Sequence, residues 1–198
     1  MKLRFFNIDV LYFLFIFLIS VSPVNAALIP RSISELTRSA DTIVTGTVVN
    51  MESEWDVERK TIFTYVTIET GQVLKNAPPK KRKKGEQITL RLEGGTVGDT
   101  TISTSEMPEF SLYEEVFLFL SVDTGLNPPS SEGDGLGDFT VRGWEMGKFT
   151  VINEEIEITD FKNDIRGKMT LGEFVKDINM ILSGSDATPS FMNPQNLK

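Results

Sequence analysis

The sequence predicts a mainly β fold, a closed barrel or a sandwich, with one short helix at each end. Stretches rich in β-branched and aromatic residues alternate with turn-forming residues at the spacing typical of small barrels and sandwiches. These stretches follow one another directly, without the helices that alternate with strands in a parallel nucleotide-binding sheet. We therefore expect about seven strands between two terminal helices, in a single domain over residues 27–183.

The first helix is expected in the segment PRSISELTRSAD. Ser32 and Glu35 have the spacing of a capping box, in which each side chain accepts a hydrogen bond from the other residue's backbone N–H. Ile33, Leu36 and Ala40 recur at helical spacing and form one apolar stripe. The helix should pack on the strands that follow it.

Three long strands are expected next, in TIVTGTVV, TIFTYVTIETGQVL and EQITLRLEG. Gly46, in the middle of the first, indicates a bend or a bulge. The first connection is polar, as expected of a hairpin tip. The second, KNAPPKKRKKGEQ, contains two prolines that end strand pairing and lysines that keep the edge soluble.

The stretch LEGGTVGDTTIST contains Gly94, Gly95 and Gly98, followed by Asp99. A phosphate-binding loop needs a helix directly after its glycines, because the first N–H groups of that helix hold the anion. Here the glycines precede β-branched residues, and Asp99 would repel a phosphate. The stretch therefore predicts a turn or a bend between strands.

The C-terminal half is expected to continue as strands and to end in a helix. Residues 115–122 predict a strand buried on both faces, and two or three short strands follow a Gly/Pro-rich loop. Thr170 and Glu173 repeat the capping-box pattern at the start of a helix that Gly184 ends. Residues 184–198 lack periodicity and predict a flexible tail.

The N-terminus has the pattern of a secretory signal peptide. Two basic residues precede an apolar run of 12 residues, Val10 to Val21. A membrane-spanning helix needs about 20 apolar residues, so the run predicts a signal peptide over residues 1–26, cleaved between Ala26 and Ala27. The alternative is an N-terminal membrane anchor that stays uncut. We expect an exported protein, periplasmic or extracellular, without stable membrane insertion after signal cleavage.

Composition limits the chemistry that the chain can perform. It contains no cysteine and no histidine, which excludes disulfides, thiol nucleophiles and imidazole bases, and with them Ser-His-Asp and Cys-His mechanisms and ordinary zinc hydrolases. The net charge is −8, and removal of the leader, which carries +1, leaves −9. Nucleic acid repels such an acidic protein as a whole, and no cofactor is expected.

Several segments together resemble a known group. The helix and strand in ELTRSADTIVTGTVV, followed by YVTIETGQVLKN, ITLRLEGGTVG, YEEVFLFL and GKFTV, resemble exported bacterial β-rich proteins whose role is not established, over about residues 30 to 183. A short helix leading straight into a long first strand also resembles the netrin/TIMP-like version of the OB barrel. This resemblance implies a mainly β, OB-like (netrin/TIMP-like) barrel with short N-terminal and C-terminal helices.

The same resemblance implies a way in which such a fold holds a partner, and this chain departs from it at one position. Inhibitors of the TIMP class place an N-terminal cysteine on the catalytic metal of their target. After cleavage this chain would begin Ala27-Leu28-Ile29-Pro30, with no cysteine, so the resemblance extends to the fold and to the exposed N-terminal segment, and not to metal chelation.

Candidate contact residues fall into three groups. The N-terminal segment Ala27–Pro30 is the first. The two tryptophans, Trp55 in a polar hairpin tip and Trp144 after an Arg-Gly pair, are candidate anchors; for Trp144, packing in the core or at its rim is the favoured interpretation, because aromatic side chains mostly serve burial. The third is the basic run Lys80, Lys81, Arg82, Lys83 and Lys84. This run suits an anionic surface or polysaccharide. No aromatic residue interleaves it for base stacking, and a solvated hairpin tip is the simpler interpretation.

Carboxylates supply the remaining candidates. The Gly-rich loop offers oxygen ligands to calcium, although their spacing matches no EF-hand loop; they are Asp123, Glu132, Asp134 and Asp138. Adjacent pairs such as Glu114–Glu115 and Glu154–Glu155 point to opposite faces of a strand and cannot act on one bond. We predict no metal site and no catalytic residue.

These observations favour a secreted or periplasmic non-enzymatic binding module, protein-binding or protease-inhibitor-like, whose partner is another exported or envelope protein. Two alternatives stand beside it. One is a carboxylate-dependent hydrolase acting on cell-envelope polymer, which needs two converging carboxylates about 5 to 10 Å apart. The other is an envelope structural protein bound through the basic run.

Overall fold

A computed structural model describes residues 29–56, 58–76, 82–105, 107–122 and 139–198. The predicted signal peptide over residues 1–26, with its cleavage site, lies outside these residues. The described elements are, in chain order, α2 (Ile33–Ser39), β1 (Thr42–Trp55), β2 (Ile62–Lys75), β3 (Gln87–Glu93), β4 (Gly95–Val97), β5 (Thr100–Ile102), β6 (Glu115–Val122), β7 (Phe139–Val141), η1 (Trp144–Gly147), β8 (Lys148–Ile152), β9 (Glu155–Asp160), β10 (Ile165–Thr170), α3 (Leu171–Leu182), η2 (Ser190–Met192) and η3 (Pro194–Asn196).

Strands β1, β2, β3, β7 and β6 form a closed barrel, because β6 pairs back onto β1. Around the barrel the strands follow the order β1-β2-β3-β7-β6, so β7, the last of the five in the sequence, lies between β3 and β6. Strands β3 and β7 run parallel and pair at Leu90 and Phe139. This is a five-stranded Greek-key barrel of the OB type. The prediction of a mainly β, OB-like barrel with two short helices is confirmed.

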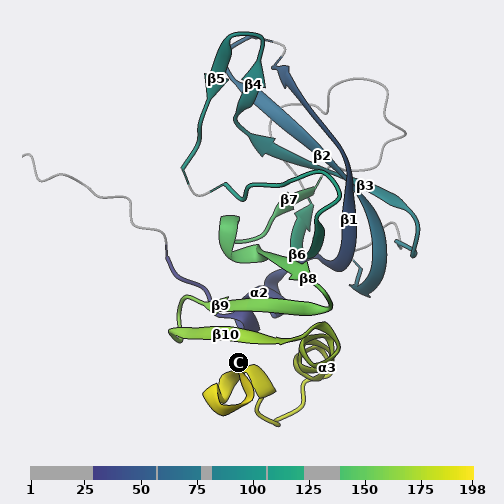
Figure 1. Cartoon of the computed structure of the whole chain (residues 1–198), viewed down its shortest axis with the longest axis vertical. Coiled ribbons are helices and arrows are strands. Elements are labelled where there is room, and N and C mark those ends of the chain that lie inside the picture. Colours follow the sequence, from purple (N-terminus) through teal and green to yellow (C-terminus); the bar gives the residue numbers. More distant parts are fainter. Residues whose placement is uncertain (1–28, 57, 77–81, 106, 123–138) are drawn as a thin grey trace, which may run out of the picture.

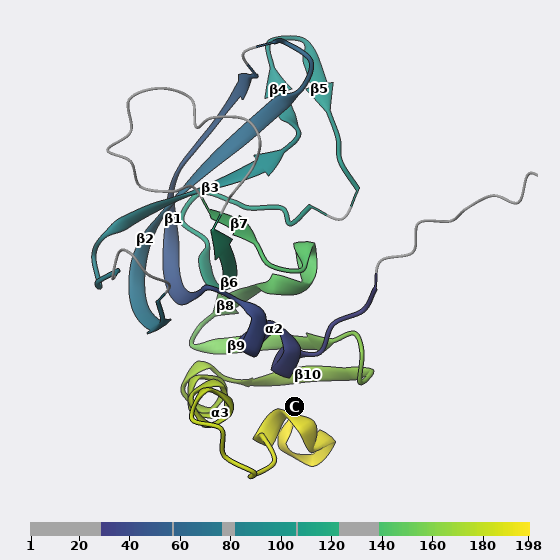
Figure 2. The same ribbon diagram turned by 180° about the vertical axis from the view of Figure 1, so that it is seen from behind.

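Strands β8, β9 and β10 extend the sheet beyond the barrel. Strand β8 pairs with the first half of β6, while β7 pairs with its second half. In Figure 1 this extension lies below the barrel with α3 beneath it, and α2 lies against β9 and β10 when seen from behind (Figure 2). The sequence predicted two or three strands after the Gly-rich loop, and the described residues form four. Strand β10 was missed because only Ile165 and Met169 in it are buried.

Strand β6 divides the interior into two cores. Val116, Leu118 and Leu120 point into the barrel, whereas Phe117 and Phe119 belong to a second core under α2, α3 and β8–β10. All five are at most 1% exposed. The prediction of a strand buried on both faces is therefore confirmed, and its cause is that two separate cores share this strand.

Aromatic rings connect the second core from end to end. Phe117 lies 5.3 Å from Phe119 and 4.9 Å from Phe174 of α3, measured between ring centroids. Phe149 of β8 lies 5.9 Å from Phe119 and 5.6 Å from Phe174. Phe191 completes the series at 6.0 Å from Phe174. Tilted and edge-on ring pairs at these distances add stability beyond area burial.

The C-terminal segment differs from the predicted flexible tail. Phe191 is fully buried, and the buried Asp177 of α3 accepts hydrogen bonds from the Ser190 hydroxyl and the Phe191 N–H, both at 3.0 Å. The backbones of Lys198 and Lys168 pair with each other, which covers the outer edge of β10. Phe191, the buried carboxylate of Asp177 and this backbone pairing hold the segment on the domain, and none of them leaves a periodic pattern in the sequence.

The glycine stretch forms the bend between β3 and the β4–β5 hairpin, as predicted. Gly94 and Gly95 have φ values of 104° and 139°, in the region that favours glycine. A side chain at Gly95 would lie 2.3 Å from the Thr64 Oγ1 and 2.7 Å from the Ser53 Oγ. Gly98 occupies the two-residue turn of the hairpin at φ 59°. The hairpin thus lies directly on β1 and β2.

Replacing Phe191 by alanine should lower the free energy of unfolding by about 3–5 kcal/mol, because it leaves a cavity beside Phe174. Chemical denaturation followed by fluorescence measures this. The control is Met192→Ala, at a side chain that is 37% exposed, where a change of about 0.5 kcal/mol is expected. Equal effects of the two substitutions would show that the segment does not pack in solution.

Gly95→Ala should destabilise the protein by about 2 kcal/mol or more, since the new methyl group collides with two side chains at a positive φ. Gly98→Ala is the matched control. It also has a positive φ, but a side chain there meets nothing within 4 Å, so about 1 kcal/mol is expected. Thermal unfolding of both variants gives the comparison. A loss of stability in the Gly98 variant as large as that in the Gly95 variant would contradict the close approach of Gly95 to Thr64 and Ser53.

Candidate functional site

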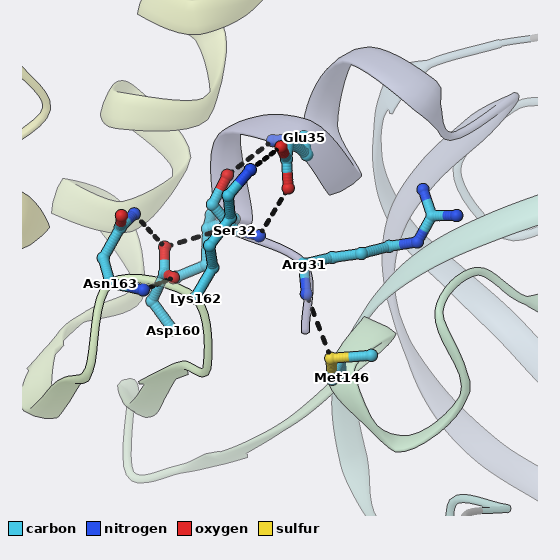
Figure 3. A network of polar contacts seen from close by, with 8 residues as sticks. Arg31, Ser32, Glu35, Met146, Asp160, Lys162 and Asn163 are labelled. Carbon is cyan, nitrogen blue, oxygen red and sulfur yellow. Dashed lines mark hydrogen bonds and ion pairs between the residues drawn. The ribbon is translucent and has the colours of Figure 1, made fainter. Parts of the chain in front are cut away.

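The start of α2 is fixed to the second core by a buried carboxylate (Figure 3). Asp160, only 1% exposed, accepts the N–H of Ile33 at 2.9 Å and the N–H of Asn163 at 2.9 Å. Ser32 and Glu35 form the predicted capping box. A charge-assisted bond from a buried carboxylate to a helix N–H is among the stronger hydrogen bonds. The first turn of α2 is therefore fixed relative to the second core.

Two further contacts hold the residues next to this turn. Lys162 pairs with the Glu35 carboxylate, and its hydrogen bond lowers the pKa of Glu35 below the ordinary value. The backbone N–H of Arg31 lies 3.5 Å from the Met146 sulfur of η1, as Figure 3 shows. Arg31 is therefore in contact with η1.

Exposed apolar side chains occur both on this segment and on η1. Ile29 is 81% exposed, Pro30 is exposed, and Trp144 is 43% exposed. Trp144 has φ 61°, a left-handed conformation that is rare for a large side chain. We call Ile29, Pro30 and Trp144 the N-terminal patch. The other predicted contacts of this segment, Ala27 and Leu28, lie outside the described residues.

Trp55, the other predicted anchor, is placed elsewhere. It ends β1, is half-buried, and pairs with Ile62 at the hairpin. In both Figure 1 and Figure 2 this end of β1 lies beside β4 and β5, at the opposite end of the molecule from α3. The structure therefore does not bring Trp55 and the N-terminal patch into one site.

The described residues of the basic run, Arg82 to Lys84, line an open hollow at the end of β2. Lys80 and Lys81 lie outside the described residues, and Lys83 and Lys84 are exposed. Arg82 is buried, with only 9% of its surface exposed, so the expected fully solvated tip is wrong at this residue. The hollow has a volume of about 760 Å³ and is lined by Thr45, Gly71, Gln72, Val73, Asn76, Arg82, Lys83 and Lys84.

Local hydrogen bonds hold the described end of this connection in place. The N–H of Arg82 donates to the Asn76 side chain at 3.0 Å, and the Asn76 amide returns a bond to the Arg82 carbonyl at 3.4 Å. The Thr70 hydroxyl lies 2.6 Å from the Lys83 carbonyl and 2.8 Å from the Glu86 carbonyl. The cations that line the hollow are thus carried on an ordered backbone.

The two carboxylates of the pair Glu114–Glu115 have different surroundings. Glu114 is 13% exposed and accepts hydrogen bonds from Lys148 and Thr150, both at 2.6 Å, whereas Glu115 is exposed. Burial alone would raise the pKa of Glu114, but the Lys148 and Thr150 hydrogen bonds and the Lys148 charge outweigh it and leave the pKa below its ordinary value. Glu155 pairs with Lys198.

Metal-ligating groups do not gather within the ranges that the structure covers: no three Asp or Glu side chains there are placed to share an ion. The four carboxylates considered for calcium, Asp123, Glu132, Asp134 and Asp138, lie outside these ranges. In the same ranges, no helix has the length and apolar character to cross a membrane. The sequence matches no protein-family model and no curated protein.

Sequence reasoning missed the buried polar residues that build these sites. Asp160 and Asp177 look like ordinary surface carboxylates, because each has one polar and one apolar neighbour in sequence and no motif marks it as buried. Arg82 looks like one cation among five. What distinguishes them is burial by residues distant in the chain, and the only local signal was a polar residue at an inward position of a strand or helix.

Glu114→Gln should lower stability by about 2 kcal/mol at neutral pH, because Lys148 loses a mostly buried ionic partner. The folded pKa of Glu114 lies below its unfolded value, so this stabilisation is complete above the unfolded pKa and is lost as pH falls through the folded pKa. Denaturant unfolding of wild type and variant from pH 7 to pH 3 should show the difference shrinking below about pH 4.5. Glu115→Gln, at the exposed neighbour, is the control and should change the free energy of unfolding at pH 7 by less than about 0.5 kcal/mol.

Proposed function

We propose that this chain is a secreted or periplasmic binding module, inhibitor-like and non-enzymatic, that holds another exported or envelope protein through the N-terminal patch. The exposed left-handed Trp144 is the observation that carries the proposal. A non-glycine residue in this conformation costs of order 1–3 kcal/mol. Trp144 is 43% exposed, so the free energy gained by burying its apolar surface offsets only part of that cost.

Tryptophan at a protein surface is the side chain most enriched among interface residues that dominate binding energy. Ile29 and Pro30 are exposed apolar residues on the segment whose Arg31 contacts η1, and they carry no charge that would need desolvation. Proline also limits the conformations of the free segment, which reduces the entropy lost on binding. The three residues thus have the composition of an interface centre.

The anchoring of the patch supports the same function. Arg31 contacts Met146, Glu35 pairs with Lys162, and Asp160 holds the first turn of α2. A contact surface held in place before binding loses little freedom when the partner docks. The absence of histidine and cysteine from the sequence supports a role that makes and breaks no covalent bonds.

Trp144→Asn tests the proposal, because asparagine tolerates the left-handed conformation while removing the ring. The immobilised chain would be incubated with the envelope fraction of its source cells and cross-linked, and the retained proteins quantified by mass spectrometry. We expect at least about a tenfold loss of one retained protein, as for an interface hot spot, with unfolding free energy unchanged or higher.

Tyr113→Asn is the matched control. Tyr113 is also an exposed aromatic residue, 78% exposed, with φ 65°, but it lies in the turn before β6. The control should keep the partner. Loss of retention in the Tyr113 variant and not in the Trp144 variant would place the contact elsewhere, and no specifically retained protein in wild type would remove the proposed function.

A further inference from the structure

Arg82 has a hydrogen-bond donor that the fold does not use. Its side chain is buried, and its Nε–H has no hydrogen-bond partner, the one such buried side-chain atom among the described residues. Leaving a buried donor unpaired is costly, more so for a charged group. Such a group needs an explanation beyond packing.

Packing explains only one face of the Arg82 guanidinium. That face lies over the Phe139 ring, with the Arg82 Cζ 5.1 Å from the ring centroid. Phe139 begins β7 and belongs to the barrel core. A lysine or methionine side chain would cover this ring as well, without burying a planar group with a forked set of donors. The stacking contact therefore does not account for the Nε–H.

The surroundings of Arg82 favour negative charge. Of the described residues that line the hollow, Arg82, Lys83 and Lys84 are cationic and none is a carboxylate. Two neutral polar side chains at its wall are engaged: the Thr45 hydroxyl accepts the Gln72 N–H at 2.8 Å, and the Asn76 side chain bonds the Arg82 backbone. This local excess of positive charge occurs in a chain whose net charge is −8.

We propose that this hollow binds an oxyanion, a phosphate, sulfate or carboxylate group. Arg82 supplies the buried donor, and Lys83 and Lys84 supply flanking positive charge. The guanidinium fork matches oxyanion geometry, and hydrogen bonds to an ionised acceptor are about twice as strong as neutral ones. The hollow lies at the end of β2, whereas the N-terminal patch lies at η1, so this site is a second one.

Nuclear magnetic resonance of the purified chain tests the site directly, because each arginine Nε–H gives its own signal. Sodium phosphate and, separately, sodium acetate would be added at constant ionic strength and pH. We expect one of them to shift the Arg82 Nε–H signal saturably and to slow its hydrogen exchange. A shift with phosphate alone assigns a tetrahedral anion, and a shift with acetate alone assigns a carboxylate.

Variants separate the site from general charge attraction. Arg82→Lys keeps the positive charge but removes the planar guanidinium and its Nε–H. It should weaken the measured affinity for the anion about tenfold or more. Lys83→Gln with Lys84→Gln should weaken it several-fold, while Lys60→Gln, in the β1–β2 hairpin, should leave it unchanged. If Arg82→Lys does not fold, the wild-type signal still decides. An Arg82 Nε–H that responds to neither anion, or only in proportion to ionic strength, overturns the proposal without touching the Trp144 test.

Discussion

The fold depends on strand β6 having an apolar side chain on both faces. Val116, Leu118 and Leu120 close the barrel from inside, and Phe117 and Phe119 form the floor of the second core. A barrel strand normally alternates apolar with polar residues, because its outer face meets water. Here the outer face meets α2, α3 and the β8–β10 extension. The phenylalanines of this one strand therefore provide much of the surface on which α2, α3 and the β8–β10 extension pack.

This arrangement joins α2 and the C-terminal segment to the same core. The aromatic series that begins at Phe117 runs through Phe174 to Phe191, so the last residues pack on the same core as the first helix. Ile33, Leu36 and Ala40 of α2 enter that core from the other side. The second core thus holds α2 by its apolar stripe, and Asp160 holds its N-terminus. Both contacts fix the position at which residues 29–31 join α2.

Sequence patterns predicted those features that are encoded locally. Both capping boxes, the apolar stripe of α2 and the two-sided burial of β6 depend on residues a few positions apart, so period and spacing reveal them. The burial of Arg82 and of Phe191 depends on Phe139 and Phe174, which lie far along the chain. No local pattern encodes such contacts. The same holds for Asp160 and Asp177, whose burial follows only from the packing of α2 and of the C-terminal segment.

The two candidate surfaces are connected through α2 and β2. The ammonium group of Lys75, at the end of β2, donates to the carbonyls of Thr37 and Arg38 at the last turn of α2, at 3.1 and 2.8 Å. Partial burial there lowers the pKa of Lys75, and the two bonds to the carbonyl end of the helix offset part of that desolvation. Strand β2 lines the basic hollow through Gly71, Gln72 and Val73, and α2 begins beside the N-terminal patch.

Both surfaces are therefore carried on elements bonded to each other and to a shared core, and neither depends on a partner for its shape. Such a frame loses little conformational entropy on binding, so a modest contact area suffices for a stable complex. An anion on the hollow and a protein on the patch would each meet a surface already in place, and occupancy of one should leave the geometry of the other unchanged. This rigidity suits a module that binds by shape and charge.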